Sequence, residues 1–212
     1  MRRLPFFIGL CVAATASAQT IPAAFERDVL HELNRARGRP AEVAAELRRY
    51  RAAMSGLIAY EPGLPEGVLT EEGAAAVDEA IAFLDAQAPL PALADSETLA
   101  RAAFLLVGEQ ARTGEVGHVA RGWGDLGARV RAAGGRGDAS ETVAYGFGGA
   151  AAAVRQFIVD DGVPDRGHRR LVFSRAVRFA GVGCATHPAY RQACAISYSA
   201  TPDAGPAQVA AR

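Results

Sequence analysis

Two of the four histidines share a local setting that suits chemistry, because His118 and His168 each directly follow a glycine in a predicted loop. Glycine lets the backbone bend, so each imidazole can be directed into a cleft. Glu141 opens a new apolar segment between them. Asp160 and Asp161 end a predicted helix, where negative charge opposes the helix dipole. These carboxylates therefore become candidates for a role other than stabilising that helix.

Two imidazoles with one or two carboxylates form a donor set suited to a divalent cation such as zinc. Without a metal, the same groups form a pH-sensitive cluster. The spacing matches no compact metal-ligand motif: His31 begins an H-E-x-x-H pattern, but Arg35 replaces its second histidine. No nucleophile elbow or phosphate-binding loop occurs either. Spacing alone therefore favours a simpler interpretation, histidines scattered on the surface.

The first 18 residues have the pattern of a secretory signal peptide, with a basic start, a short apolar run and a small-x-small site that ends at Ala18. The apolar run is too short for a comfortable membrane span. Export would place Cys184 and Cys194 in an oxidising compartment, where cysteines normally pair. They lie in two strand-like runs around a polar turn, so a hairpin would bring them within reach of a disulfide. We expect a protein that is secreted or periplasmic.

The composition excludes several classes of protein. The chain has 23 basic and 23 acidic residues, which argues against a broad nucleic-acid surface or a polybasic membrane patch. Half of the residues are hydrophobic and 22% are charged, which argues against a disordered chain. We expect a single monomeric domain over residues 19–212, with no nucleic-acid partner and no membrane span.

Helices are expected before strands along the chain. The region 56–73 is rich in Pro and Gly, which predicts a surface connection in which the Tyr60 side chain packs against the protein. The tail from Thr201 is expected to be frayed. This order predicts an α+β fold with helices packed on a small sheet. The expected helices cover residues 22–36, 41–54, 70–87, 97–112 and 150–159, and the expected strands cover 178–185 and 193–200.

Taken in order, short motifs in the chain resemble the CAP superfamily of cysteine-rich secretory proteins, antigen 5 and plant pathogenesis-related proteins, with the bacterial secreted branch as the nearest likeness. Each motif is short, and the resemblance depends on their shared order and spacing. The matching stretches are Leu33-Asn34-Arg35-Ala36-Arg37, Leu99-Ala100-Arg101-Ala102-Ala103, Gly117-His118-Val119, Ser140-Glu141-Thr142-Val143-Ala144, Gly167-His168-Arg169-Arg170-Leu171 and Gly181-Val182-Gly183.

The chain also departs from the family pattern. The family usually writes its central motif as G-E-N-I-A, and this chain has S-E-T-V-A around Glu141. Phe157 stands where the family commonly has Trp, and Asp160 matches the position of a second family glutamate. Asp161 is an alternative candidate for this position, because a shift of one residue along the helix would bring Asp161 to the place of Asp160. Residues 40–92 have no counterpart in the compact family pattern.

The resemblance implies an α-β-α sandwich, with helices on both faces of a small antiparallel sheet. It also implies a solvent-open cleft lined by His118, Glu141, Asp160 and His168. The insertion at about 40–92 would be an additional helical segment of the same domain.

Two functions of different classes follow from these residues. The first is a non-enzymatic secreted binding module, in which His118, His168 and an acid hold a divalent cation such as zinc, and a separate apolar groove accepts a lipid or peptide. The alternative is a metal-assisted hydrolase of peptide or cell-wall bonds, with Glu141 as the general base. A third interpretation leaves the four polar residues as loop supports, with residues 40–92 as a partner surface.

Overall fold

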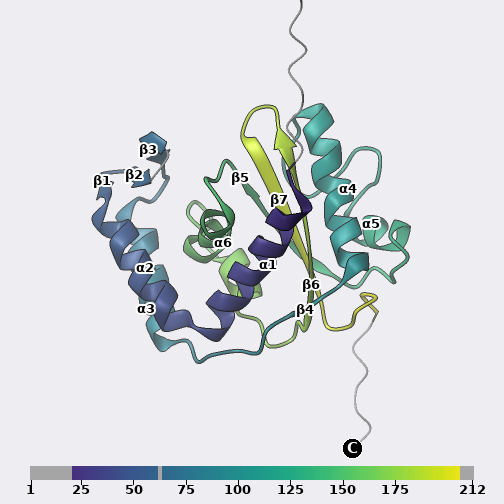
Figure 1. Ribbon diagram of the computed structural model, residues 1–212, viewed down its shortest axis with the longest axis horizontal. Helices are drawn as coiled ribbons and strands as arrows, with labels where there is room; N and C mark the ends of the chain where they lie inside the picture. The colour runs from purple at the N-terminus through teal and green to yellow at the C-terminus, as the bar shows by residue number, and fades with distance from the viewer. Residues whose placement is uncertain (1–20, 62–63, 206–212) are drawn as a thin grey trace, which may run out of the picture.

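The computed structural model describes residues 21–61 and 64–205, and the predicted signal peptide lies outside them. These residues form an α+β fold, which confirms the predicted class (Figure 1). The elements in chain order are α1 (Ala23–Gly38), α2 (Pro40–Ala52), β1 (Met54–Ser55), β2 (Ile58–Glu61), β3 (Leu64–Leu69), α3 (Ala74–Ala86), β4 (Ala94–Asp95), α4 (Glu97–Thr113), α5 (Leu126–Ala132), β5 (Ser140–Tyr145), α6 (Ala150–Val159), α7 (Gly167–Val172), β6 (Phe179–His187) and β7 (Arg191–Ser199).

The central sheet has the strand order β4-β6-β7-β5. Its three long strands are antiparallel, and β4 adds a two-residue parallel pairing to β6. Helices α4 and α5 lie on one side of this sheet, and α1 and α6 lie on the other (Figure 1). Alternate residues of the strands fill the two layers: Val182 and Ile196 join the core under α1 and α6, while Ala195 packs with α4. This period of two is what a sheet buried on both faces requires.

Two glycines in β6 allow α4 to lie directly on the sheet. A Cβ atom at Gly181 would be 2.0 Å from the backbone nitrogen of Ala100, and one at Gly183 would be 2.4 Å from that of Phe104. No side chain fits in this space, so the Gly-x-Gly motif acts as the contact surface for α4.

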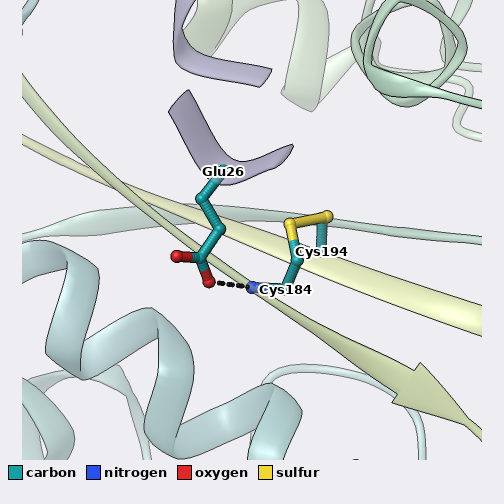
Figure 2. The surroundings of a disulfide bond; sticks show 3 residues. All are labelled: Glu26, Cys184 and Cys194. Atoms are coloured by element: carbon teal, nitrogen blue, oxygen red, sulfur yellow. Dashed lines mark hydrogen bonds between the residues drawn. A yellow bond between two sulfur atoms is a disulfide. The ribbon is translucent and has the colours of Figure 1, made fainter. Parts of the chain in front are cut away.

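The predicted disulfide between Cys184 and Cys194 is present and joins directly opposite residues of β6 and β7. On the same hairpin, the carboxylate of Glu26 from α1 accepts a hydrogen bond from the Cys184 backbone N–H at 2.9 Å (Figure 2). The first helix and the final hairpin are therefore held together beside the covalent link.

The insertion contains more regular structure than the sequence indicated. Residues 56–73 were expected to form a surface connection, and instead they supply β2 and β3 of a three-stranded antiparallel sheet between α2 and α3. Tyr60 is 44% exposed rather than packed down. The strands are short and interrupted by Pro and Gly, so their alternation is too brief to show in the sequence. This unit lies beyond α6, on the side of the molecule away from α4 and α5 (Figure 1).

The expectation of a frayed tail from Thr201 does not hold for residues 201–205. Ala204 is fully buried, and backbone bonds join Arg136 to Asp203 and Asp138 to Ala204. Residues 206–212 lie outside the described part of the chain. No helix within the described ranges is long and apolar enough to cross a membrane.

Candidate functional site

Glu141, the second residue of β5, holds His118 on one side and an arginine on the other. One carboxylate oxygen lies 3.0 Å from His118 Nδ1, and the other accepts a hydrogen bond of 2.6 Å from Arg129 Nη2. The Glu141 side chain is 2% exposed and that of Arg129 is fully buried. Arg129 comes from α5 and also donates to the His118 backbone carbonyl at 2.8 Å. The loop of His118 is therefore fixed at both its backbone and its ring.

Tyr145, from the same strand as Glu141, supports the loop that carries His118. The Tyr145 hydroxyl accepts a hydrogen bond from the Gly117 backbone N–H at 2.9 Å and donates to the Gln110 side chain at 3.2 Å. Burial raises the pKa of Tyr145, so its hydroxyl keeps the proton that it donates. Gly117 itself has φ of +93°, a conformation that favours glycine. The glycine before His118 is thus required by the backbone, as its position in the sequence suggested.

His168, at the start of α7, is held by Asp160 in a similar way. Its Nδ1 lies 2.6 Å from one Asp160 oxygen, and the other oxygen accepts the backbone N–H groups of His168 and Arg169. Asp160 is the left-handed residue that ends α6, with φ of +56°. Its carboxylate therefore serves the beginning of α7 rather than opposing the dipole at the end of α6.

The two histidine–carboxylate pairs face each other. The ring centroids of His118 and His168 are 6.5 Å apart, and Phe157 packs edge-on against His168 with centroids 5.9 Å apart. Phe157 stands where the family commonly has Trp, and it forms a wall of the cleft. In both pairs the carboxylate occupies Nδ1, so each ring keeps its Nε2 atom for another partner.

Asp161, the rival candidate, has a different partner. Its two carboxylate oxygens accept the backbone N–H groups of Glu71 and Glu72, at 2.6 and 2.8 Å, just before α3. It therefore attaches the insertion to the end of α6 and takes no part in the histidine cluster.

Ion pairs extend this attachment along the segment that carries His168. Arg166 bonds both oxygens of Glu72, at 2.5 and 2.7 Å, and also reaches Glu79. Arg169 donates to Glu79 at 2.7 Å and to the backbone carbonyls that end α6. The insertion thus contacts the same short loop that positions one of the two imidazoles.

Sequence reasoning missed Arg129 entirely. It lies in α5 with no distinctive motif around it, and its burial, which Arg37 and Arg169 share, does not show in the sequence. The remaining histidines are elsewhere: His31 is exposed on α1, and His187 is buried with its Nε2 against the Glu115 backbone carbonyl.

Residues 30–198 match the family model described as CAP, the cysteine-rich secretory protein family. The chain belongs to this family. No curated protein matches it. Among solved structures, it is similar to an extracellular protein containing an SCP domain from Bacillus anthracis str. Ames, with 18% identity and a TM-score of 0.45. The match covers 61% of this chain and 38% of that chain, so this chain spans well under half of that protein's length.

This CAP domain has a pocket of about 470 Å³ between its central sheet and the insertion. Val143, Phe147 and Phe157 line it on the side of β5 and α6, and Val68 and Leu69 line it on the side of β3. Asp160 and His168 lie at its border, so the pocket adjoins the cleft. Its volume lies within the usual range for small-ligand sites, and its lining is mostly apolar.

Proposed function

We propose that this CAP protein is a secreted, non-enzymatic binding module whose cleft holds a divalent cation through His118 and His168. The observation that supports it is the shared arrangement of the two rings, each bonded at Nδ1 to a buried carboxylate. Metal-binding histidines commonly have such a partner, which fixes the tautomer and leaves Nε2 as the ligand atom. The His118 side chain is half exposed, so the cleft is open to solvent at this ring.

The donor set fits zinc only as an open site. Within residues 21–61 and 64–205, no cluster of three or more His, Cys, Asp or Glu side chains could hold a metal ion. Glu141 and Asp160 are already used as partners of the rings, which leaves two imidazole ligands. Zinc prefers four ligands, so water or a bound molecule would complete its coordination. A bound zinc would supply Lewis acidity and a strong attraction for oxygen donors.

The geometry favours binding over hydrolysis. A general base needs a carboxylate oxygen free to take a proton, and both oxygens of Glu141 are engaged, by Arg129 and by His118. Glu141 therefore acts as an orienting group for His118.

The second part of the proposal concerns the apolar pocket, which we assign to an organic ligand, a lipid or a peptide. Export is supported by the predicted signal peptide and by the disulfide, which persists in an oxidising compartment. We expect the exported chain to act as a monomer.

Calorimetric titration of zinc into the exported chain tests the cation site. The wild type should bind one zinc, and the double variant His118→Ala/His168→Ala should show no binding heat. His31→Ala is the matched control, because the His31 side chain is exposed and its ionic partner is Glu32, which is not a residue of the cleft. Equal heats for the wild type and the double variant would end the metal proposal. Turnover of casein or peptidoglycan that is lost in Glu141→Gln would favour the hydrolase instead.

A further inference from the structure

The strand that carries Glu141 has one open edge. β5 lies at the end of the central sheet and pairs only with β7. In an antiparallel pair, every second residue directs both its N–H and its C=O to the partner strand, and the residues between direct both outward. The Gly146 N–H bonds to the Gln192 carbonyl of the β7 side, so the even-numbered residues of β5 face β7. Glu141, Val143 and Tyr145 therefore direct their backbone groups outward.

One outward group has a partner that supports this assignment. The Tyr145 carbonyl accepts a hydrogen bond of 2.9 Å from the Gln156 side chain of α6. Among the described residues, the outward N–H and C=O groups of Glu141 and Val143 have no such partner. At this edge the Tyr145 carbonyl already has a hydrogen-bond partner, whereas the outward backbone groups of Glu141 and Val143 are available to another strand.

The exposure of Glu141 agrees with an open edge. The residue as a whole is partly exposed, whereas its side chain is only 2% exposed, so the accessible part is the main chain. Val143 is also partly exposed and lines the 470 Å³ pocket. The open edge of β5 therefore borders the pocket at Val143.

The opposite edge of the sheet is covered. The carbonyls of Arg178, just before β6, and of Ala180, in β6, accept the N–H groups of Ala94 and Ser96. The Cys184 N–H donates to the Glu26 carboxylate (Figure 2). Val182, the remaining outward-facing residue in this stretch, is 5% exposed. Sheet edges are normally protected in this way, because unpaired strands bind other chains.

We propose that the cleft takes an extended peptide, which adds to β5 as a further strand and places one bulky apolar side chain in the adjoining pocket. The backbone of a peptide offers the same alternating N–H and C=O groups that Glu141 and Val143 leave unpaired, and a lipid does not. Only two residues of β5 are open, so backbone pairing alone is weak. The pocket between Val143 and the insertion supplies the apolar contact. This inference deepens the ligand-binding part of the proposed function and names peptide as the ligand.

A bound peptide would lie beside the histidines. Glu141 is one of the two pairing residues, and its carboxylate holds His118 at 3.0 Å. A strand added at this edge brings its own carbonyl oxygens next to the cleft, where they could complete the coordination of a cation that has only two protein ligands.

An N-methyl scan tests strand addition directly. The probe is a fluorescein-labelled octapeptide that alternates threonine with phenylalanine, and its binding is followed by fluorescence polarisation in EDTA. Methylation removes one N–H at a time. We expect losses of about tenfold at two positions that lie two residues apart, and tolerance at the other positions, because only the carbonyls of Glu141 and Val143 are open to peptide N–H groups. Replacing a single phenylalanine by alanine should weaken binding where that ring fills the pocket.

Variants of Val143 provide the matched protein test. Val143→Pro removes an outward N–H but no bond to β7, so the fold should persist, and peptide affinity should fall about tenfold. Val143→Ala keeps the outward N–H, so it should lose less peptide affinity than Val143→Pro does. If Val143→Pro does not fold, the methyl scan on the wild type still decides.

The outcomes separate this inference from the zinc proposal. The peptide titration is run in EDTA and needs no metal, so a failed zinc titration leaves the strand proposal intact. Methylation that weakens binding equally at all positions, or not at all, would overturn strand addition. No binding of the octapeptide by the wild type would do the same, and preferential binding of fatty-acid vesicles would assign the pocket to a lipid.

Discussion

Arg129 and Glu141 form an ion pair at 2.6 Å in which both side chains are shielded from solvent. Breaking a buried pair by removing one partner leaves an uncompensated charge, which typically costs about 3–5 kcal/mol of folding free energy. Arg129→Met should therefore lower the free energy of unfolding by about that amount, measured by urea titration. Arg131→Met is the control on the same helix, because Arg131 is exposed, and it should change stability by less than about 0.5 kcal/mol. A small effect of Arg129→Met would show that Glu141 needs no countercharge.

The two neighbouring aspartates should separate in function. Asp160 orients His168 and Asp161 binds backbone N–H groups before α3. Loss of an orienting carboxylate typically reduces metal affinity about 10–100-fold, so Asp160→Asn should weaken zinc binding to that extent in a calorimetric titration. Asp161→Asn should leave zinc affinity unchanged. Equal effects of both substitutions would mean that the insertion, and not Asp160, controls the ring.

Close contact between β6 and α4 predicts a large effect of a single methyl group. Gly181→Ala would place its Cβ 2.0 Å from the Ala100 backbone nitrogen, so α4 would have to move. Overpacking of this kind costs about 1–3 kcal/mol or more, which thermal or urea unfolding would detect. Gly38→Ala is the control, since its Cβ would meet nothing within 4 Å, and it should be neutral or slightly stabilising. A neutral Gly181→Ala would show that α4 adjusts freely.

The disulfide should contribute to stability despite the short loop that it closes. Cys184 and Cys194 are separated by 10 residues, and loop-closure entropy for a loop of this size corresponds to about 2–3 kcal/mol. Guanidinium unfolding of the double variant Cys184→Ala/Cys194→Ala should show a loss of that order. Reduction of the wild type by dithiothreitol should reproduce it. The zinc titration serves as the control, because the histidines lie on other elements, and it should be unaffected.

Local patterns in the sequence were sufficient for several features of this fold. The cysteines on two strand-like runs predicted the disulfide, and the glycine before His118 predicted a bend that Gly117 makes with φ of +93°. His168 was also expected in a loop, and it lies instead in the first turn of α7. The α+β class followed from the order of helices and strands, although β5, the strand that carries Glu141, was not among the predicted strands.

Features that depend on distant contacts could not be read in this way. Arg129 resembles any other helical arginine until burial places it against Glu141. The choice between Asp160 and Asp161 is made by partners in α7 and before α3, far apart in the chain. The sheet of the insertion has strands too short for their alternation to be distinctive.

The ion pair between Glu72 and Arg166 predicts how the attachment of the insertion responds to acid. The hydrogen bond from Arg166 lowers the pKa of Glu72 from 4.5 to about 2. Because the folded-state pKa is depressed, the stabilisation is complete above about pH 4.5 and is lost as the pH falls toward 2. Glu72→Gln removes this titration, so between pH 7 and pH 3 its unfolding free energy should decline less than that of the wild type. Glu71→Gln is the control, since the Glu71 side chain makes no ion pair within the described residues, and it should follow the wild type. Parallel pH profiles for Glu72→Gln and the wild type would show that this pair contributes nothing to holding the insertion against the loop of His168.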